Sequence, residues 1–259
     1  MDQSGKQMLK GVSRSFYLTL RILPGPMRGA ASLGYLLART SDTLADSGRA
    51  PHELRLGFLE QFRAAVAEGR DPPRWPVSFL NTVADGRERR LLEGSGDLVG
   101  WLGKLAAGEA ALIREVVEII ISGQRLDLVR FAAATREHPV ALSDDTALED
   151  YAWRVAGCVG AFWTKLGFHT LGNRFSISTE ADLLDRGVAY GKGLQMVNIL
   201  RDVGEDLSHG RCYLPVANPL DGTALAECHS RWLEVAHRWL REGERYASCL
   251  LYTSPSPRD

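Results

Sequence analysis

Two distant segments of the chain each place two aspartates four residues apart within an apolar stretch of helical period. Asp42 and Asp46 lie in the first segment, and Asp202 and Asp206 lie in the second. Residues at i and i+4 share a helix face, so each pair would stack two carboxylates. Their repulsion costs a few tenths of a kcal/mol in water, about what a bound cation would remove. Hard carboxylate oxygens suit Mg²⁺, which leaves coordination positions for water and substrate phosphate.

Other polar groups accompany each aspartate pair. At about 100° per residue, the stripe of the second segment consists of Gln195, Asn198, Asp202, Glu205, Asp206 and His209. The apolar side is expected to hold Leu194, Val197, Leu200, Val203 and Leu207. The stripe of the first segment consists of Arg28, Tyr35, Arg39, Asp42 and Asp46, with Leu33, Leu36, Leu37 and Leu44 opposite. A solvated charged face is the alternative for either stripe alone. The repetition favours metal-bridged diphosphate binding.

Composition excludes several classes of protein. A formal net charge of -1 gives no electrostatic basis for nucleic-acid binding. A hydrophobic content of 45% with 24% charged residues is typical of a globular protein. The four cysteines form no C-x-x-C pair, so neither a zinc site nor a disulfide framework is indicated, and a reducing compartment is expected. No signal peptide and no apolar run of membrane-spanning length is recognised.

Most of the chain reads at helical period, and no run of alternating strand residues stands out, so the sequence predicts an all-α fold. Helices are expected over 77–92, 98–105, 109–133, 151–171 and 223–251. Within the long segment 109–133, Asp127 is interpreted as a salt-bridge partner of Arg125 or Arg130, with a polar group in a cavity as the alternative.

Three further features admit a structural and a functional interpretation. Ser13, Arg14 and Ser15 cluster near an expected helix start, where they could bind an anion or cap the helix. Arg211 could meet a diphosphate or simply face water at a helix end. The small face around Gly157 and Gly160 is interpreted as close helix packing, with room for an apolar ligand as the alternative.

The last residues, 252–259, are of low complexity and follow a helical pattern that has no cap. We expect them to be non-native or disordered, and the natural chain to continue differently at its C-terminus.

Four motifs in this order resemble the squalene and phytoene synthase family, the head-to-head prenyl-diphosphate synthases. They are SRSF from Ser13, YLLARTSDTLAD from Tyr35, YAWRVAGCVG from Tyr151 and QMVNILRDVGEDLSHGRCYLP from Gln195. The resemblance implies a single isoprenoid-synthase domain over residues 1–251, an all-α helical bundle around a central cavity. It also implies Mg²⁺-dependent condensation of two prenyl diphosphates.

The resemblance assigns roles to matching positions. The Mg²⁺ ligands would be Asp42, Asp46, Asn198, Asp202 and Asp206. Diphosphate or substrate contacts would come from Ser13, Arg14, Ser15, Tyr35, Arg39, Gln195, Arg201 and Arg211. Tyr151 corresponds to a tyrosine near the reacting centre, and the aspartates together with Tyr151 form the expected catalytic set.

The wording around Asp42, with Thr43 in place of a second aspartate, favours farnesyl diphosphate as substrate and squalene as product, through presqualene diphosphate. Squalene formation would require NADPH. The alternatives are phytoene synthesis from geranylgeranyl diphosphate and dehydrosqualene synthesis. A head-to-tail prenyltransferase or terpene cyclase is disfavoured by SRSF and YAWRVAGCVG, and a catalytically silent assembly protein by the intact aspartates.

Because such products are insoluble in water, we expect a cytoplasmic protein that works peripherally at the inner face of the membrane without spanning it. No nucleic-acid partner is expected, and a monomer or weak dimer is the expected state.

Overall fold

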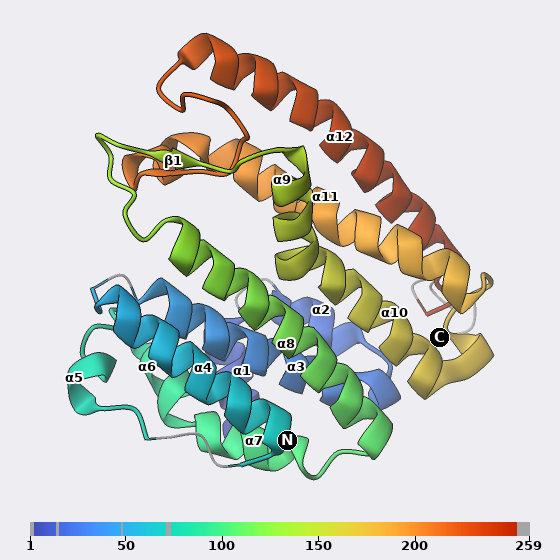
Figure 1. Ribbon diagram of the computed structural model, residues 1–259. Coiled ribbons are helices and arrows are strands. Elements are labelled where there is room, and N and C mark those ends of the chain that lie inside the picture. The colour runs from blue at the N-terminus through green and yellow to red at the C-terminus, as the bar shows by residue number, and fades with distance from the viewer. Residues whose placement is uncertain (1–2, 14–15, 48, 71–73, 253–259) are drawn as a thin grey trace. The chain divides into compact units, whose positions relative to one another are not determined.

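The computed structural model describes residues 3–13, 16–47, 49–70 and 74–252. Contacts divide the chain into two compact units, Met1–Arg125 with Leu166–Arg174, and Leu126–Lys165 with Phe175–Asp259. Figure 1 shows that coiled ribbons dominate both units, which confirms the predicted all-α fold. Arg14, Ser15 and the predicted tail after Tyr252 lie outside the described residues.

The first unit is built from helices alone in its described part. They are α1 (Gln3–Val12), α2 (Phe16–Ile22), α3 (Gly25–Asp46), α4 (His52–Glu68), α5 (Val77–Leu80), α6 (Gly86–Glu93), α7 (Ser95–Leu102), most of α8 (Ala107–Arg130) and the short 3-10 turn η2 (Gly172–Arg174). The expected helix over 77–92 is therefore wrong: residues 81–85 interrupt it, and Asp85 caps α6 by accepting a hydrogen bond from the Arg87 backbone N–H.

Helix α3 has clear sequence causes. Pro24 precedes it and Pro26 lies in its first turn, where a proline loses no helical hydrogen bond. Its predicted apolar side is confirmed, because Leu33, Leu36 and Leu44 are at most 1% exposed. Burial of each such side chain stabilises the fold by about 1.5–3 kcal/mol.

The second unit combines helices with one very short sheet. Its elements are β1 (Val140–Ala141), α9 (Asp145–Ala152), the π-helical turn η1 (Trp153–Gly157), α10 (Cys158–Leu171, whose end belongs to the first unit), α11 (Glu180–Ser208), β2 (Arg211–Cys212) and α12 (Gly222–Cys249). The two strands pair in parallel, Val140 opposite Arg211. Two residues per strand are too few for a period-2 pattern, so the sequence did not reveal them.

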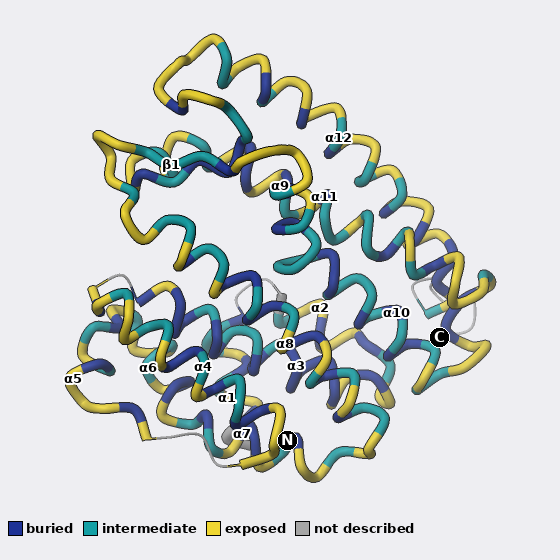
Figure 2. The backbone as a smooth tube through the Cα atoms, viewed as in Figure 1, coloured by how far each residue is buried: buried dark blue, intermediate teal, exposed yellow. Residues whose placement is uncertain are grey.

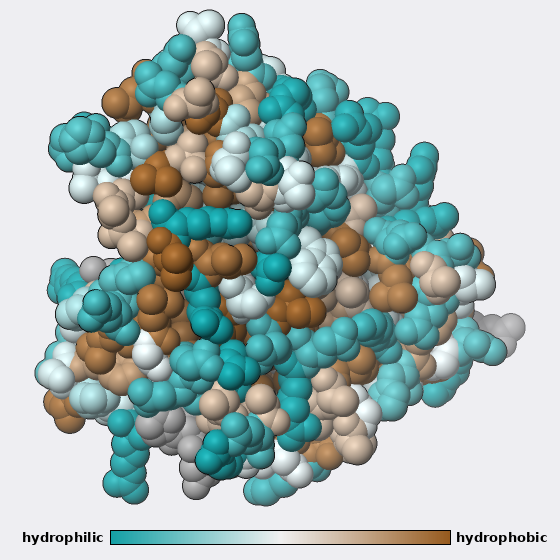
Figure 3. Space-filling model, in the orientation of Figure 1, coloured by the Kyte–Doolittle hydropathy of each residue, from teal (hydrophilic) through white to brown (hydrophobic). Residues whose placement is uncertain are grey.

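Helices α11 and α12 lie side by side in this unit (Figure 1). Along α12, buried positions recur at helical spacing, and Figure 2 shows them alternating with exposed ones. Trp232 and Tyr246 are buried, as predicted, and Val235 and Trp239 are half-buried. Hydrophilic side chains cover most of the outer surface over α12 in Figure 3. No described helix is both long enough and apolar enough to cross a bilayer.

Glycines let two helices of the second unit approach closely. A methyl group on Gly160 of α10 would lie 1.9 Å from the backbone oxygen of Gly187 on α11. A methyl on Gly191 would lie 2.3 Å from the oxygen of Ala156. Real Cβ atoms do not come that close, so only glycine fits. The helix-packing interpretation of the small face is thus confirmed.

Candidate active site

In the first unit, the predicted aspartate pair lies at the C-terminal end of α3. The Asp42 carboxylate accepts a hydrogen bond of 2.5 Å from Gln124 Nε2 of α8, and Arg39 Nη1 lies 3.8 Å from its other oxygen. Arg39 also pairs with Glu88 of α6. Burial and the negative charge of Asp46 raise the pKa of Asp42 to about 7, against an ordinary value of 3.8. A cation that bound here would relieve both effects.

Two polar residues of the predicted site, Tyr35 of α3 and Ser13 after α1, donate hydrogen bonds to backbone carbonyls of α1. The Tyr35 hydroxyl donates to the Val12 carbonyl at 3.2 Å, so it ties α3 to the end of α1. Ser13 is buried and donates to the Leu9 carbonyl at 2.5 Å. Ser13 directly follows the end of α1, and α2 begins three residues later at Phe16. Whether the Ser13–Ser15 cluster caps α2 is not tested, because Arg14 and Ser15 lie outside the described residues. The role of Ser13 in anion binding stays a prediction.

In the second unit, the other aspartate pair lies near the C-terminal end of α11. Arg201 holds Asp202 with two bonds, Nε to Oδ1 at 2.7 Å and Nη2 to Oδ2 at 2.6 Å. The Arg201 side chain lowers the pKa of Asp202. Burial raises the pKa of Asp206, whose carboxylate lies 3.7 Å from Arg211 Nη2 on β2. Arg201 and Arg211 thus each pair with one carboxylate of this aspartate pair.

Two amides of the predicted site lie upstream on α11: Asn198, a predicted metal ligand, and Gln195, a predicted substrate contact. Asn198 is exposed and Gln195 half-buried. The side facing the core holds Met196, Ile199 and Leu200. The predicted apolar side is wrong at two positions, because Leu194 and Val197 are 47% and 42% exposed. They lie next to Asn198 on the exposed side of the helix.

Tyr151, the predicted catalytic tyrosine, belongs to a buried cluster that sequence reasoning did not assemble. It is 8% exposed on α9, and its ring stacks on that of Tyr213 with centroids 4.7 Å apart. The Tyr213 hydroxyl donates to Asp127 Oδ2 of α8 at 2.6 Å. Desolvation raises the pKa of Asp127 to about 6.

The favoured salt bridge of Asp127 is wrong. Arg125 pairs with Glu60 at 3.2 Å, and the hydrogen-bond partner of Asp127 is a tyrosine hydroxyl. The sequence analysis missed Gln124 and Tyr213, and it named Asp127 without its tyrosine partner. The signal present in the sequence was two polar residues in the middle of an apolar helix and the tyrosine of GRCYLP.

The described residues contain no group of three or more His, Cys, Asp or Glu side chains placed to hold a metal ion. Each helix supplies two carboxylates, so a cation at either one would complete its coordination with water and substrate oxygens. Mg²⁺ commonly binds in this way, through one or two carboxylates and substrate phosphates. The donor chemistry of each pair therefore fits magnesium.

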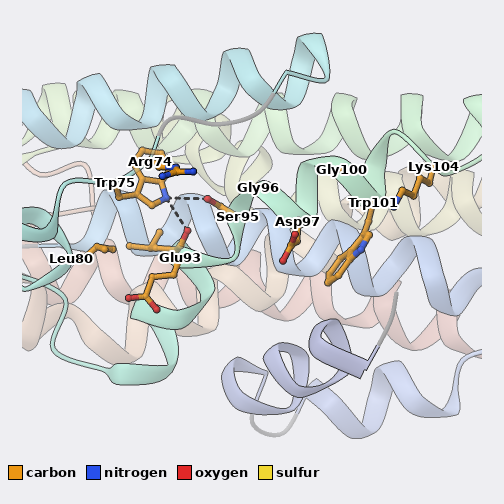
Figure 4. Close-up of a pocket in the computed structure, with 11 residues that line it drawn as sticks. Arg74, Trp75, Leu80, Glu93, Ser95, Gly96, Asp97, Gly100, Trp101 and Lys104 are labelled. Atoms are coloured by element: carbon orange, nitrogen blue, oxygen red, sulfur yellow. Dashed lines mark hydrogen bonds between the residues drawn. The ribbon is translucent and has the colours of Figure 1, made fainter.

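A cavity of about 620 Å³ lies elsewhere, within the first unit. Trp75 and Trp101 contribute to its wall, and the Trp75 Nε1–H donates to the Leu92 carbonyl and to Ser95 Oγ (Figure 4). None of the predicted site residues lines it. The cavity is therefore not part of the predicted diphosphate-binding site.

Comparison with known proteins identifies the family. A profile of the squalene/phytoene synthase family matches residues 9–250. The presqualene diphosphate synthase of Rhodopseudomonas palustris is 33% identical over 204 residues, which is 78% of this chain and 58% of that protein. The bifunctional lycopene cyclase/phytoene synthase of Phaeosphaeria nodorum is 29% identical over 210 residues, 80% of this chain and 33% of that protein.

A solved structure of TcSQS with a ligand superimposes with a TM-score of 0.74 at 25% identity and covers 96% of this chain and 72% of that one. The chain spans less than two thirds of the length of the two curated relatives named above. The family profile nevertheless covers nearly all of this sequence. The chain belongs to the squalene/phytoene synthase family.

Proposed function

We propose that the protein joins two molecules of farnesyl diphosphate head to head to form presqualene diphosphate. One observation carries the proposal: Asp42 and Asp46 stand one turn apart at the end of α3, with Gln124 Nε2 2.5 Å and Arg39 Nη1 3.8 Å from the Asp42 carboxylate. Partial burial and the charge of Asp46 raise the Asp42 pKa. Such a pair favours a bound cation, and cation and arginines together suit a diphosphate. The similarity to a presqualene diphosphate synthase supports the choice of substrate.

The reaction makes specific demands. The C1–O bond of one substrate breaks, C1 bonds to the 2,3-alkene of the other, a proton leaves, and diphosphate is released. Mg²⁺, held by Asp42, Asp46, Asn198, Asp202 and Asp206, would neutralise the charge that develops on the leaving diphosphate. Arg39 and Arg211, each beside an aspartate, would add positive charge at that group. Arg201 would exchange Asp202 for the substrate.

The allylic cation must be kept from water. Leu194 and Val197 present apolar surface next to Asn198, which suits the prenyl chain of a substrate whose diphosphate is bound further along α11. Ser13, Tyr35 and Gln195 are proposed as additional polar contacts to the substrate.

Squalene is the proposed end product if the protein also carries out the NADPH-dependent second step. Phytoene synthesis from geranylgeranyl diphosphate is the second candidate, because a bifunctional phytoene synthase is 29% identical to the chain. Peripheral contact with a membrane follows from the insolubility of either hydrocarbon.

Product analysis by mass spectrometry tests the proposal. The protein would be incubated with farnesyl or geranylgeranyl diphosphate, with and without Mg²⁺ and NADPH. We expect magnesium-dependent diphosphate release and presqualene diphosphate from farnesyl diphosphate without NADPH. A 40-carbon product alone would favour the second candidate. No diphosphate release from either substrate would contradict the proposal.

A matched pair of variants separates catalysis from folding. Asp42→Asn keeps an acceptor for Gln124 and removes the charge, whereas Asp145→Asn removes a carboxylate that pairs with Arg231 at the surface of the second unit. Loss of a single electrostatic group at a reacting centre typically costs about 10²–10³ in kcat. We expect that loss for Asp42→Asn alone.

A further inference from the structure

The buried cluster of Asp127, Tyr213 and Tyr151 contains an unused acceptor. Asp127 Oδ2 accepts the Tyr213 hydroxyl at 2.6 Å, while the buried Oδ1 meets no donor among the described residues at full hydrogen-bond geometry. The Tyr151 hydroxyl nevertheless lies close enough to the carboxyl group to lower its pKa by hydrogen bonding. An unsatisfied buried carboxylate oxygen is costly, and such atoms usually have a functional reason.

Ring contacts hold the cluster in one arrangement. Tyr213 stacks on Tyr151 with an angle of 22° between the ring planes, and its other neighbour Phe131 meets it edge-on at 5.3 Å. Both tyrosines belong to the hydrophobic core formed with α11 and α12. Packing therefore fixes the position of Tyr151 through Tyr213, and Tyr213 through its bond to Asp127.

Electrostatics connect the same three side chains. The Asp127 charge raises the pKa of Tyr151 and of Tyr213, in each case after the larger effect of burial. The charged groups that face Asp127 are Arg130 of α8 and Arg211 of β2, both of which favour its ionised form. Neither arginine outweighs burial, so the carboxyl group exchanges its proton near neutral pH.

We propose that Asp127 is a positioning residue for Tyr151 and the final acceptor of the proton released in the condensation. In this step the C1–H bond of the substrate breaks and its electron pair forms the second cyclopropane C–C bond. The proton passes to the Tyr151 oxygen as the Tyr151 hydroxyl proton passes to Asp127 Oδ1. Tyr151 is unchanged, Asp127 becomes neutral, and it returns the proton to solvent after product release. The inference rests on the function proposed above.

Steady-state kinetics of three variants with farnesyl diphosphate test the inference. Asp127→Asn keeps an acceptor for the Tyr213 hydroxyl but takes up no proton. We expect kcat to fall about 100-fold, within the range for general base catalysis, with little change in KM. Asp127→Glu should restore part of the rate. Tyr213→Phe keeps the ring stack and loses the bond, and we expect a loss of about 10-fold.

Tyr246→Phe is the matched control. Tyr246 is a buried tyrosine of the same unit whose hydroxyl bonds Thr164 at 2.9 Å, and it takes no part in the proposed chemistry. Removing the Tyr246 hydroxyl also breaks one buried hydrogen bond. The variant therefore shows how far the loss of such a bond changes kcat through stability alone. We expect kcat within twofold of the wild type. A melting temperature for each variant identifies any that fail to fold.

The pH profile distinguishes proton transfer from a structural role. The wild-type kcat should fall below about pH 6 as Asp127 becomes protonated, and Asp127→Asn should lose that limb. Suppose that the wild type turns over and that Asp127→Asn has the same kcat or keeps the acidic limb of the pH profile. Either result would overturn the inference and leave the proposed function intact. If Asp127→Asn does not fold, full activity of Tyr213→Phe overturns it instead. A wild type that releases no diphosphate overturns both.

Discussion

At the scale of single residues, the candidate site contains a carboxylate whose negative charge lowers the stability of the fold. Asp42 is held at a pKa of about 7 by burial and by Asp46, so its ionised form is less stable in the folded chain than in the unfolded one. The Asp42 side chain is still 41% exposed, so solvent screens part of this cost. A carboxylate that lowers the stability of the fold in this way is explained by a role in function.

The first prediction concerns this cost. Because the folded pKa of Asp42 is raised, its protonated form stabilises the fold below about pH 4, and that contribution is lost as pH rises through about 7. Asp42→Asn should therefore unfold like the wild type at pH 4 and be more stable by about 1 kcal/mol at pH 8, after allowance for screening. Urea unfolding at the two pH values measures the difference. Equal stability at pH 8 would contradict it.

The second prediction concerns the effect of Mg²⁺ on the stability of the wild type and of Asp42→Asn. Millimolar Mg²⁺ should raise the melting temperature of the wild type at pH 8, since an ion that binds only the folded state stabilises it by mass action. Asp42→Asn should show a much smaller shift. Calcium-free buffer and an Asp145→Asn control, which should respond like the wild type, exclude a general salt effect.

Two side-chain hydrogen bonds of the candidate site could not be predicted from the sequence. Gln124 and Asp127 are polar residues in an apolar helix, and their partners Asp42 and Tyr213 are more than eighty positions away in the chain. Nothing in local spacing distinguishes such a partner from the neighbouring Arg125 or Arg130. The local salt bridge was the natural interpretation and it was wrong.

At the scale of elements, glycine positions decide which helices can approach. Gly160 of α10 meets the Gly187 backbone of α11, whereas Gly204 of α11 has open space where a methyl would go. Both glycines lie within helices, where alanine is intrinsically better by up to about 1 kcal/mol. The effect of the same substitution should therefore differ in sign.

This difference is the third prediction. Gly160→Ala should destabilise the fold by about 1–3 kcal/mol or more, because the added methyl overlaps backbone that cannot rotate away. Gly204→Ala should stabilise it by at most about 1 kcal/mol. Thermal and urea unfolding of the two variants measure both effects. A neutral Gly160→Ala would show that α10 and α11 do not pack as closely as described.

The exposed apolar side of α11 gives a fourth prediction. Val197→Asp should lower the affinity for a prenyl diphosphate about 10-fold or more, since the new carboxylate would face the apolar prenyl group of the ligand. Affinity for inorganic diphosphate should change little, because the aspartates are untouched. The side chain is 42% exposed, so stability should stay within about 0.5 kcal/mol. Calorimetric titration with both ligands tests the difference. An equal loss of affinity for both ligands would contradict it.

At the scale of the whole molecule, helical period predicted the fold class and most long helices. The boundaries of α3, α4 and α12 follow prolines, glycines and caps that are visible in the sequence. The break after Leu80 and the β1–β2 pair were missed, because short elements have too few residues to show a period. The site residues were found as two separate stripes. That they serve one substrate is a prediction of the proposed function, as is the single domain over residues 1–251.

The convergence of the two stripes on one magnesium-bound diphosphate is the central claim. A double-mutant cycle with Asp42→Asn and Asp202→Asn tests it through the dissociation constant of an unreactive farnesyl thiodiphosphate in the presence of Mg²⁺. If both aspartates hold the same complex, the double variant should bind no more than about fivefold worse than either single variant, with a coupling free energy of about 1 kcal/mol or more. Losses that add within about 0.5 kcal/mol would show that the two sites act independently and would contradict the account.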